Sequence, residues 1–478
     1  MEAPRPRPRA HGLAVELTGQ CNQGCGYCFN AWRGDGVRSP PGLPPEELRS
    51  LLSRALDEVD FRAVTFSGGE PLTRPDLFDL VDLVKARGPR VHVVSNGALV
   101  TDAIADRLAA RRPISVQITL NGPTAALHDA LVDARSFERT LEGIRRLLAR
   151  GVAVTGTIVV TRRNAHAVGE TLEVFHALGV REIGLSRFSP AGYSAAHVAE
   201  LLPSRADVLG ALAAAERFAS ARAEASVALL LPVPSCVARP EEHPHLSFGS
   251  CPVGTPLQEL ALGPDGGLRH CLLHPAAFVP DMRTSSFAEA LVAPAVTGYR
   301  DVTPAFCAPC AERDTCGGGC GAAASSVFGE ARALDPFVAQ EVDPAFRERL
   351  RVSRGEVLPT TALVRKCDRR RALAGALASV AIAACDKPAA PVSAPIEPPR
   401  PPPVDASAPP PPPPPPPALD ASAPPAPADL DAGARDAGDA AAPGRVAGRD
   451  AGVRPPTVAP SGKKKPPYQG CPTMQSVE

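Results

Sequence analysis

Short β-branched runs alternate with longer amphipathic stretches from Gly12 to about residue 190. The runs predict strands at 13–17, 63–66, 91–94, 115–120, 152–160 and 182–185. The stretches between them predict helices at 46–59, 76–87, 101–111, 136–150 and 167–178. Six strands with intervening helices indicate repeated βαβ units and a parallel sheet, either open or curled into a partial barrel. In such sheets chemistry gathers at the carboxyl ends of the strands.

The pattern changes beyond the sixth strand. An Ala-rich stretch, 205–227, predicts a helix, and prolines 232 and 234 mark a boundary before a short, loop-rich, Cys-rich region. The last 93 residues contain nearly half of the 56 prolines and only three large aliphatic side chains, so they are expected to form a disordered tail. The chain is predicted to consist of a barrel domain at 10–230, a small α+β cysteine-rich domain at 231–345, an Ala-rich helical segment at 346–385 and a Pro/Ala-rich tail at 386–478.

Composition narrows the functional classes. Lys plus Arg and Asp plus Glu are equal at 51 each, which removes any charge-based argument for binding nucleic acid or an anionic membrane. The chain has 478 residues, enough for two or three domains, and contains no run of 18 apolar residues. Most of its 13 cysteines lie in tight clusters at metal-ligand spacing. We therefore expect thiolate ligation in a reducing compartment, the cytoplasm.

The first cluster follows the first predicted strand. Cys21, Cys25 and Cys28 have the spacing CxxxCxxC on a loop that contains glycine. Three thiolates this close can bind three irons of a [4Fe–4S] cluster and leave the fourth iron without a protein ligand, as in catalytic metal sites. The alternatives are a zinc site, which would need a fourth ligand, and a disulfide with a spare thiol.

This loop resembles the one that defines the radical S-adenosylmethionine superfamily, with Tyr27 as the aromatic residue before the third cysteine. The resemblance implies a partial (β/α)6 TIM-like barrel. It also implies that the open iron binds the amino and carboxylate groups of S-adenosylmethionine. Reductive cleavage would then yield a 5′-deoxyadenosyl radical that takes hydrogen from a substrate.

A Ser-Gly-Gly-Glu-Pro sequence follows the second predicted strand. Gly68 and Gly69 allow a close approach of backbone to a ligand, and Glu70 or nearby carbonyls can accept from an ammonium group. The sequence resembles the motif that binds the methionine amino group in this superfamily. A common turn is the alternative for the motif taken alone.

Other polar residues end later strands. Ser95 and Asn96 follow the third, and Thr119 stands where relatives carry a serine that bonds the cofactor. Asn121 replaces the more usual aspartate, and Arg187, after the sixth strand, is a candidate partner for the cofactor carboxylate. Each of these residues also suits an ordinary turn.

The second cysteine cluster resembles a SPASM domain, which in relatives houses two auxiliary [4Fe–4S] clusters. The resemblance implies that Cys251, Cys271 and Cys320 serve the first auxiliary cluster. It assigns three further cysteines to the second: Cys307, Cys310 and Cys316. One or two structural zinc ions are the alternative.

Two ligands are missing from this pattern. The family's seventh cysteine follows an Asp-Pro pair, whereas here Asp335-Pro336 is followed by Phe337. The second auxiliary cluster is therefore expected to have an open iron, a ligand other than cysteine, or Cys367. Cys236 is the candidate for the fourth ligand of the first auxiliary cluster.

Residues 366–385 combine basic residues, a 13-residue apolar run and a final cysteine. They suggest an internal lipobox-like segment, which is the one basis for a membrane partner, an Ala-rich helix, or the start of a secreted or precursor sequence that is fused to the enzyme.

Three functions fit the sequence. The preferred hypothesis is a radical enzyme that cross-links or oxidises a peptide or small protein, with a ferredoxin or flavodoxin as reductant. The second is a radical oxidoreductase that acts on a small alcohol or sugar. The third is a non-catalytic scaffold held together by zinc.

Overall fold

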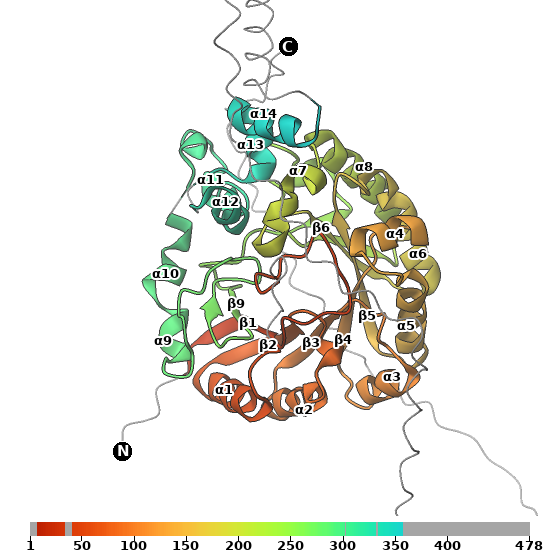
Figure 1. Ribbon diagram of the computed structural model, residues 1–478, viewed down its shortest axis with the longest axis vertical. Coiled ribbons are helices and arrows are strands. Elements are labelled where there is room, and N and C mark those ends of the chain that lie inside the picture. Colours follow the sequence, from red (N-terminus) through yellow and green to blue (C-terminus); the bar gives the residue numbers. More distant parts are fainter. Residues whose placement is uncertain (1–6, 34–40, 302, 331–332, 357–478) are drawn as a thin grey trace, which may run out of the picture. The chain divides into compact units, whose positions relative to one another are not determined.

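Strands that follow one another along the chain lie side by side in a curved parallel sheet (Figure 1). The structure is a computed structural model that describes residues 7–33, 41–301, 303–330 and 333–356. The ten strands in these ranges pair in the order β10-β9-β1-β2-β3-β4-β5-β6-β7-β8. Their bounds are β1 Arg9–Glu16, β2 Asp60–Ser67, β3 Arg90–Ser95, β4 Ser115–Thr119, β5 Ala153–Val160, β6 Glu182–Arg187, β7 Ser226–Leu229, β8 Leu246–Phe248, β9 Glu259–Leu262 and β10 Leu268–Arg269. Neighbours are parallel except for β9 and β10.

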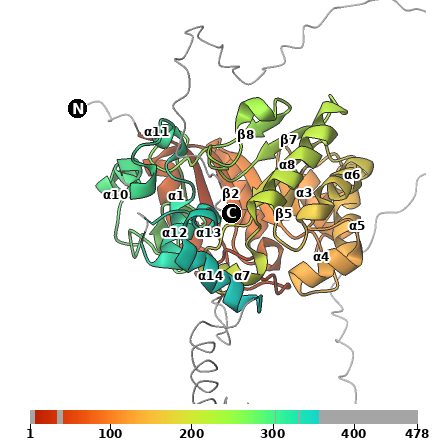
Figure 2. The ribbon, with the colours of Figure 1, turned by 90° about the horizontal axis from the view of Figure 1, so that it is seen from above.

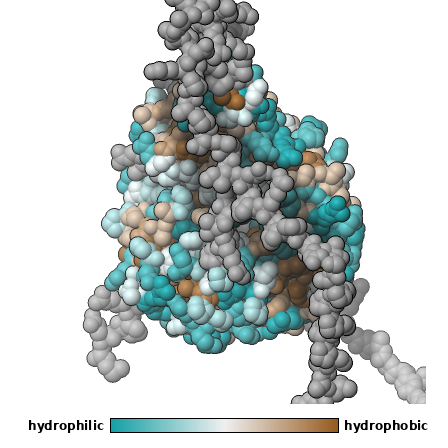
Figure 3. Space-filling model, in the orientation of Figure 1, coloured by the Kyte–Doolittle hydropathy of each residue, from teal (hydrophilic) through white to brown (hydrophobic). Residues whose placement is uncertain are grey.

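Helices cover the outer face of this sheet (Figures 1 and 2). The helices of the barrel segment are α1 Pro45–Glu58, α2 Leu77–Arg87, α3 Asp102–Ala109, α4 Ala125–Val132, α5 Phe137–Ala149, α6 Val168–Leu178, α7 Val198–Leu201 and α8 Arg205–Ser220. Those that follow are α9 Phe287–Leu291, α10 Pro294–Thr297, α11 Arg313–Cys316, α12 Gly321–Phe328, α13 Pro336–Val342 and α14 Pro344–Ser353. The helices are amphipathic, and the surface in Figure 3 is accordingly mostly hydrophilic, with hydrophobic patches.

The core lies between the sheet and its helices. In β3, Val91 and Val93 are buried, whereas His92 and Val94 are half-buried and line the interior of the barrel. On α5, Ile144 and its apolar neighbours one turn away are buried against the sheet. Alternate residues of each strand are therefore buried against one face of each helix. The opposite face of each strand remains available for a site.

The fold class and the six predicted strands are confirmed, because β1 to β6 coincide with these segments to within one residue at each segment's outer limits or extend beyond them, and they form a parallel sheet with the topology of a partial TIM-like barrel. The predicted helix at 205–227 is wrong at its end. Helix α8 stops at Ser220, and β7 pairs with β6 from Ser226 onward. The residues of β7 alternate between buried and more exposed positions, which is the pattern of a strand rather than a helix.

The cysteine-rich segment contributes strands to both edges of the sheet. Strand β9 pairs with β1 in parallel, and β8 pairs with β7. Strands β8, β9 and β10 of this segment are therefore part of the same sheet as the barrel strands. The predicted lipobox-like segment and tail lie outside the described residues. Among the residues that the structure does describe, no helix has both the length and the apolarity needed to cross a membrane.

A buried ion pair joins β1 to β10. The Arg269 guanidinium contacts the Glu16 carboxylate, and both side chains are almost completely shielded from solvent. Trp32, the single tryptophan, donates from Nε1 to Glu16 Oε2 at 3.1 Å. Arg269 also donates to the carbonyls of Leu272 and His274, at 3.1 and 3.0 Å. This pair therefore fixes the loop that carries Cys271.

We expect Arg269→Met to destabilise the protein by about 3–5 kcal/mol, because it leaves the Glu16 carboxylate buried without its cation. The double variant Glu16→Leu/Arg269→Met should recover much of that loss. Urea unfolding of the cluster-loaded protein, followed by circular dichroism and Trp32 emission, measures both effects. Arg283→Met, at an exposed arginine that pairs with Glu47, is the matched control and should change little. Equal effects of the two single variants would contradict this role of Arg269.

Candidate active site

A cavity of about 480 Å³ occupies the interior of the barrel and its mouth at the carboxyl ends of the strands. It is lined by the cysteine loop, by strand residues from β2 to β6, and by residues of the cysteine-rich segment that include Glu259 of β9, Leu272 and Leu273. Of the eight predicted cofactor-binding residues, seven line it: Tyr27, Gly68, Gly69, Ser95, Asn96, Thr119 and Arg187. The structure therefore brings strand-end residues that are distant in sequence to one site.

Cys21, Cys25 and Cys28 all line this cavity. Their loop is held by backbone hydrogen bonds from Gly24 N to Val132 O at 2.9 Å and from Ser194 N to the Cys28 carbonyl at 3.0 Å. Burial raises the pKa of Cys21 to about 11 and that of Cys25 to about 12. Because metal ligation requires thiolates, a metal must displace these protons when it binds.

The two glycines after β2 pack directly against the cysteine loop. Gly69 N donates to Thr18 O at 2.6 Å, and Glu70 N donates to Gln20 O at 2.9 Å. A Cβ atom on Gly69 would lie 1.9 Å from Gln20 O, and one on Gly68 would lie 2.5 Å from Thr18 O. These glycines therefore allow the backbone before the cysteine loop, rather than a ligand, to approach them closely. This contact fixes the cysteine loop over the strand ends.

Glu70 joins two strand ends. Its Oε1 accepts from Ser95 Oγ at 2.9 Å and from Leu72 N at 3.1 Å, while Oε2 accepts from Asn96 N at 2.9 Å. The Glu70 side chain is buried, and it is not among the described residues that line the cavity. Burial raises its pKa to about 7, against the opposing effect of these three hydrogen bonds. The carboxylate therefore positions Ser95 and Asn96.

Asn96 and Thr119 face the cavity, and Asn121 does not. Asn96 Nδ2 donates to Asn22 Oδ1 at 2.7 Å and lies 4.0 Å from Cys21 Sγ. Asn121 is fully buried, and its Oδ1 accepts from Val159 N at 2.8 Å. Asn121 therefore joins the end of β4 to β5.

Arg187 lines the cavity, but its guanidinium is directed to protein groups. It forms an ion pair with Asp335, and Nε donates to Pro232 O at 2.9 Å. The side chains of both ion-pair partners are almost completely buried. Asp335 also accepts from Cys320 N at 2.7 Å and from Phe337 N at 2.9 Å. The positive charge expected to meet a cofactor carboxylate is thus already compensated by an aspartate.

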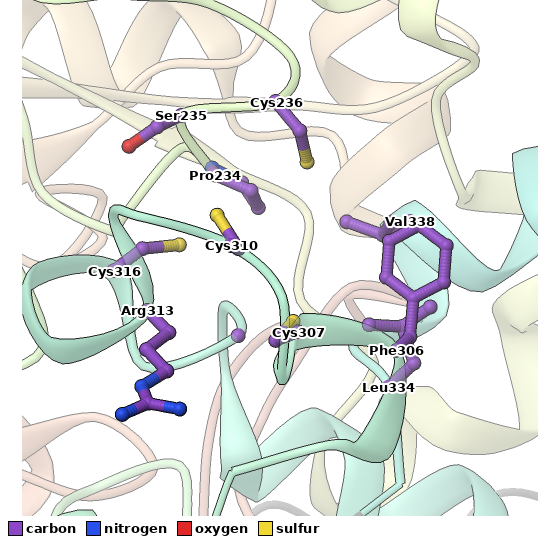
Figure 4. A pocket seen from close by; sticks show the side chains of 11 residues that line it. Pro234, Ser235, Cys236, Phe306, Cys307, Cys310, Arg313, Cys316, Leu334 and Val338 are labelled. Atoms are coloured by element: carbon purple, nitrogen blue, oxygen red, sulfur yellow. The ribbon is translucent and has the colours of Figure 1, made fainter. Parts of the chain in front are cut away.

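The cysteine-rich segment presents two further sets of thiols. Cys251, Cys271 and Cys320 interact electrostatically with one another and with Tyr299. A cavity of about 330 Å³ lies beside them, and His270, His274, Tyr299 and Arg300 are among the residues that line it. The second set, Cys307, Cys310 and Cys316, lines a separate small cavity (Figure 4).

Cys236 lies with the second set and not, as expected from the sequence, with Cys251, Cys271 and Cys320. It lines the same small cavity as Cys307, Cys310 and Cys316. The reason is the turn after β7, in which Val237 N donates to Pro234 O at 2.8 Å. This turn directs residue 236 toward the second set, a feature that spacing in the sequence does not reveal.

Comparison with known proteins identifies the family. Residues 15–175 match the model of the radical SAM superfamily. The chain is 30% identical over 336 residues to the PqqA peptide cyclase of Streptomyces rochei, covering 68% of this chain and 88% of that protein. The chain belongs to the radical SAM superfamily. Its expected resemblance to SPASM-type members is thereby confirmed.

Other relatives match over a shorter length or in fold alone. Mycofactocin maturase MftC of Mycobacterium tuberculosis is 33% identical over 193 residues, which cover 40% of this chain and 48% of that protein. The chain thus spans about half the length of the mycofactocin maturases that it matches. Streptococcus suis SuiB bound to its precursor peptide SuiA is similar in fold, with a TM-score of 0.56, 17% identity, and coverage of 69% of this chain and 75% of SuiB.

The radical SAM cofactors are a [4Fe–4S] cluster and S-adenosylmethionine, and the residues present fit both. Three thiols share one cavity with uncharged polar groups, and Thr157 Oγ1, in the cavity wall, has no hydrogen-bond partner among the described residues. Within those residues, no three Cys, His, Asp or Glu side chains converge as a single metal ion requires. A four-iron cluster does not need such convergence, because each thiolate binds a different iron.

Several cavity residues were missed by the sequence analysis. They lie on β2 to β6 and β9 and are polar: Thr65, His92, Ser115, Gln117, Thr155, Thr157, Ser186 and Glu259. The available signal was the polar residue at every second position of β-branched strands such as Val91-His92-Val93. In a closed barrel, that face points into the interior rather than toward solvent.

We expect the contribution of Glu70 to the stability of the protein to fall as the pH rises from 4.5, the ordinary pKa of this group, to about 7, its value in the folded chain. In this interval the unfolded chain releases a proton that the folded chain retains. The loss should be on the order of 3 kcal/mol. Urea unfolding at a series of pH values, compared between the native chain and Glu70→Gln, measures the contribution of this residue.

Ser95→Ala is the control for this effect. It keeps the carboxyl group but removes a hydrogen bond that lowers the folded-state pKa of Glu70, so the upper limit of the pH interval should rise while its lower limit stays at 4.5. A Glu70→Gln variant with the pH dependence of the native chain would contradict the assignment.

Proposed function

We propose that this chain is a radical SAM enzyme that modifies a peptide or a small protein, by a cross-link or by an oxidation. The observation that supports this most directly is the composition of the central cavity. It combines the three thiols of the cysteine loop with a polar interior and with Leu272 and Leu273, next to Cys271. The names of the relatives, a peptide cyclase and an enzyme bound to a precursor peptide, support the substrate class.

Cys21, Cys25 and Cys28 would hold the [4Fe–4S] cluster, and the Asn96 amide, beside Cys21, would contact the bound cofactor. When bound, the cluster and S-adenosylmethionine together supply a 5′-deoxyadenosyl radical that removes a hydrogen atom from the substrate. The chain itself binds, orients and shields the reactants. A cavity of about 480 Å³ lies in the size range typical of small-molecule and cofactor sites.

The interior residues provide the means to orient a substrate. Two of them, the Thr157 hydroxyl and the Gln117 amide, line the cavity on neighbouring strands. The Thr157 hydroxyl has no hydrogen-bond partner among the described residues. Glu259 lines it from β9, and Thr65 Oγ1 donates to Glu259 Oε1 at 3.0 Å. Burial raises the pKa of this carboxyl group. These groups offer hydrogen bonds in the cavity, while Val94 and Val159, which also line it, provide apolar contacts.

The partners of the reaction follow from its chemistry. Reductive cleavage of S-adenosylmethionine needs an electron from outside the chain, and we propose a ferredoxin or a flavodoxin as its source. We also propose that the protein works in the cytoplasm, because its thiol ligands require a reducing compartment.

We expect the anaerobically reconstituted protein, given dithionite and S-adenosylmethionine, to release 5′-deoxyadenosine. The triple variant Cys21→Ala/Cys25→Ala/Cys28→Ala should reduce this to background, since it removes every protein ligand of the first cluster. It should also lose about four irons while retaining the auxiliary iron. Chromatography of the nucleoside and iron analysis provide the two measurements. Cys471→Ala, which removes a cysteine outside the three clusters, is the control.

Mass spectrometry of synthetic peptides and of the chain itself after turnover then tests the substrate class. A loss of two mass units from a peptide, dependent on Cys21, Cys25 and Cys28, would support a cross-link or an oxidation. Consumption of a small alcohol or sugar, with all peptides unchanged, would favour the small-molecule function. A colourless protein that contains zinc and forms no 5′-deoxyadenosine would overturn the proposal.

A further inference from the structure

Four thiols from two distant parts of the chain surround one small cavity in the cysteine-rich segment. Figure 4 shows the Cys236 side chain on one side and those of Cys307, Cys310 and Cys316 on the other, with their sulfur atoms directed into a shared space. The remainder of the wall is mainly apolar and includes Pro234, Phe306, Gly318, Leu334 and Val338. A mainly apolar enclosure lined by four thiols has the composition of a site for an iron–sulfur cluster, in which each thiolate binds a different iron.

The position of Cys236 is fixed by the barrel. Its turn is closed by the hydrogen bond from Val237 N to Pro234 O, and Val237 and Ala238 are buried. Just before this turn, Pro232 O accepts from Nε of Arg187, at the end of β6. The thiol is therefore presented by a segment that is anchored at both ends of the turn.

The other three thiols are arranged by local structure. Cys310 N donates to Cys307 O at 3.0 Å, and Cys316 N donates to Glu312 O at 2.8 Å. Gly318, with φ of 80°, packs so closely that a Cβ atom there would lie 2.6 Å from Pro304 Cδ. A tight turn thus keeps residues 316–318 against this cavity.

Electrostatic interactions separate this group from the other set of thiols. Cys236, which is half-buried, interacts electrostatically with Cys316, Cys307 and Cys310. Cys271 interacts instead with Cys320 and Cys251. Two groups of thiols, one of four and one of three, therefore lie in separate surroundings.

Phe337 explains why the fourth thiol has to come from elsewhere. Its side chain is fully buried, and its ring lies 5.2 Å from the Arg187 guanidinium carbon. The next residue, Val338, lines the cavity of the four thiols. The helix that begins at Pro336 thus turns position 337 toward Arg187 and presents position 338 to the cavity.

We propose that Cys236, Cys307, Cys310 and Cys316 are the complete ligand set of one auxiliary iron–sulfur cluster. In this arrangement Cys236 supplies the thiolate that the family pattern places after the Asp-Pro pair. Cys251, Cys271 and Cys320 form a separate set of three. This assignment deepens the auxiliary-cluster part of the proposed function, and it holds whatever the substrate is.

The test uses the full chain, reconstituted anaerobically with iron and sulfide, and compares variants by iron content and by electron paramagnetic resonance. Cys236→Ala should lose one to four irons or convert one cluster to a three-iron form with its own signal after oxidation. Ser235→Ala, in the same turn, is the matched control and should keep the full iron content. A Cys236→Ala protein with unchanged iron content and spectrum would overturn the assignment.

Double variants decide to which set Cys236 belongs. Cys236→Ala/Cys310→Ala should lose no more iron than Cys310→Ala alone, about four, because both residues would bind one cluster. Cys236→Ala/Cys271→Ala should lose the sum of the two single losses. The reverse pattern would place Cys236 with Cys251 and Cys271 and would contradict the proposal.

A further test is thiol alkylation, which uses the unaltered protein, so its result does not depend on whether a variant folds. In the cluster-loaded protein, Cys236 should resist iodoacetamide together with Cys307 and Cys316, and a chelator should release all of them in one step. Peptide mass spectrometry reads each position. Alkylation of Cys236 at the same rate before and after chelation would overturn the assignment. The radical activity of the first cluster is measured separately by 5′-deoxyadenosine, so a failure of the proposed function and a failure of this assignment are distinguishable.

Discussion

The buried ion pair between Arg187 and Asp335 connects the wall of the central cavity to the segments that carry the auxiliary thiols. Arg187 ends β6 in the wall of the central cavity, and Asp335 begins α13 in the cysteine-rich segment. The same two side chains reach Pro232 O, just before the Cys236 turn, and Cys320 N. Burial of two charges costs solvation energy, and removal of one partner costs about 3–5 kcal/mol. The structural role of the Arg187–Asp335 pair is therefore to position both sets of auxiliary thiols relative to the barrel.

The pair of Glu16 and Arg269 has the corresponding role at β1. It holds the loop that carries Cys271, and the next two residues of that loop line the central cavity. The cysteine-rich segment is thus joined to the sheet by a charged pair at β1 and by another at β6. Between these strands lie the residues of the barrel interior. The spacing between the cysteine loop and the auxiliary thiols follows from these two attachments and from the strand pairing of β9 with β1.

Much of the fold could be predicted because the local pattern and the tertiary structure agree in the first six strands. Each β-branched run is buried against a helix on one face. Prediction failed at Ser226, where four residues of strand follow an Ala-rich helix, because pairing with β6 outweighs helix propensity. It also failed for polar interior residues such as His92 and Gln117, because the sequence does not show whether the second face of a strand meets solvent or a cavity.

The cysteines show the same limit more sharply. The spacing of Cys21, Cys25 and Cys28 is local, so one loop brings all three to the cavity, and the sequence alone was sufficient. The auxiliary thiols come from segments far apart in the chain, and their grouping depends on which turns face one another. Cys236 joins Cys307, Cys310 and Cys316 because a turn after β7 is anchored to Arg187, which no spacing rule contains.

The two auxiliary sets differ in their relation to the central cavity. The set of three is adjacent to it, since Leu272 and Leu273 follow Cys271 into the cavity wall and Ser189, also in that wall, contacts Cys320. The set of four is enclosed by an apolar wall of its own. Four thiolates satisfy a cluster completely and leave no position for a substrate, which suits the transfer of electrons. Three thiolates leave one position open, as catalytic metal sites do. In the proposed assignment, the set of three therefore lies beside the cavity in which a substrate would be held, and the set of four lies apart from it.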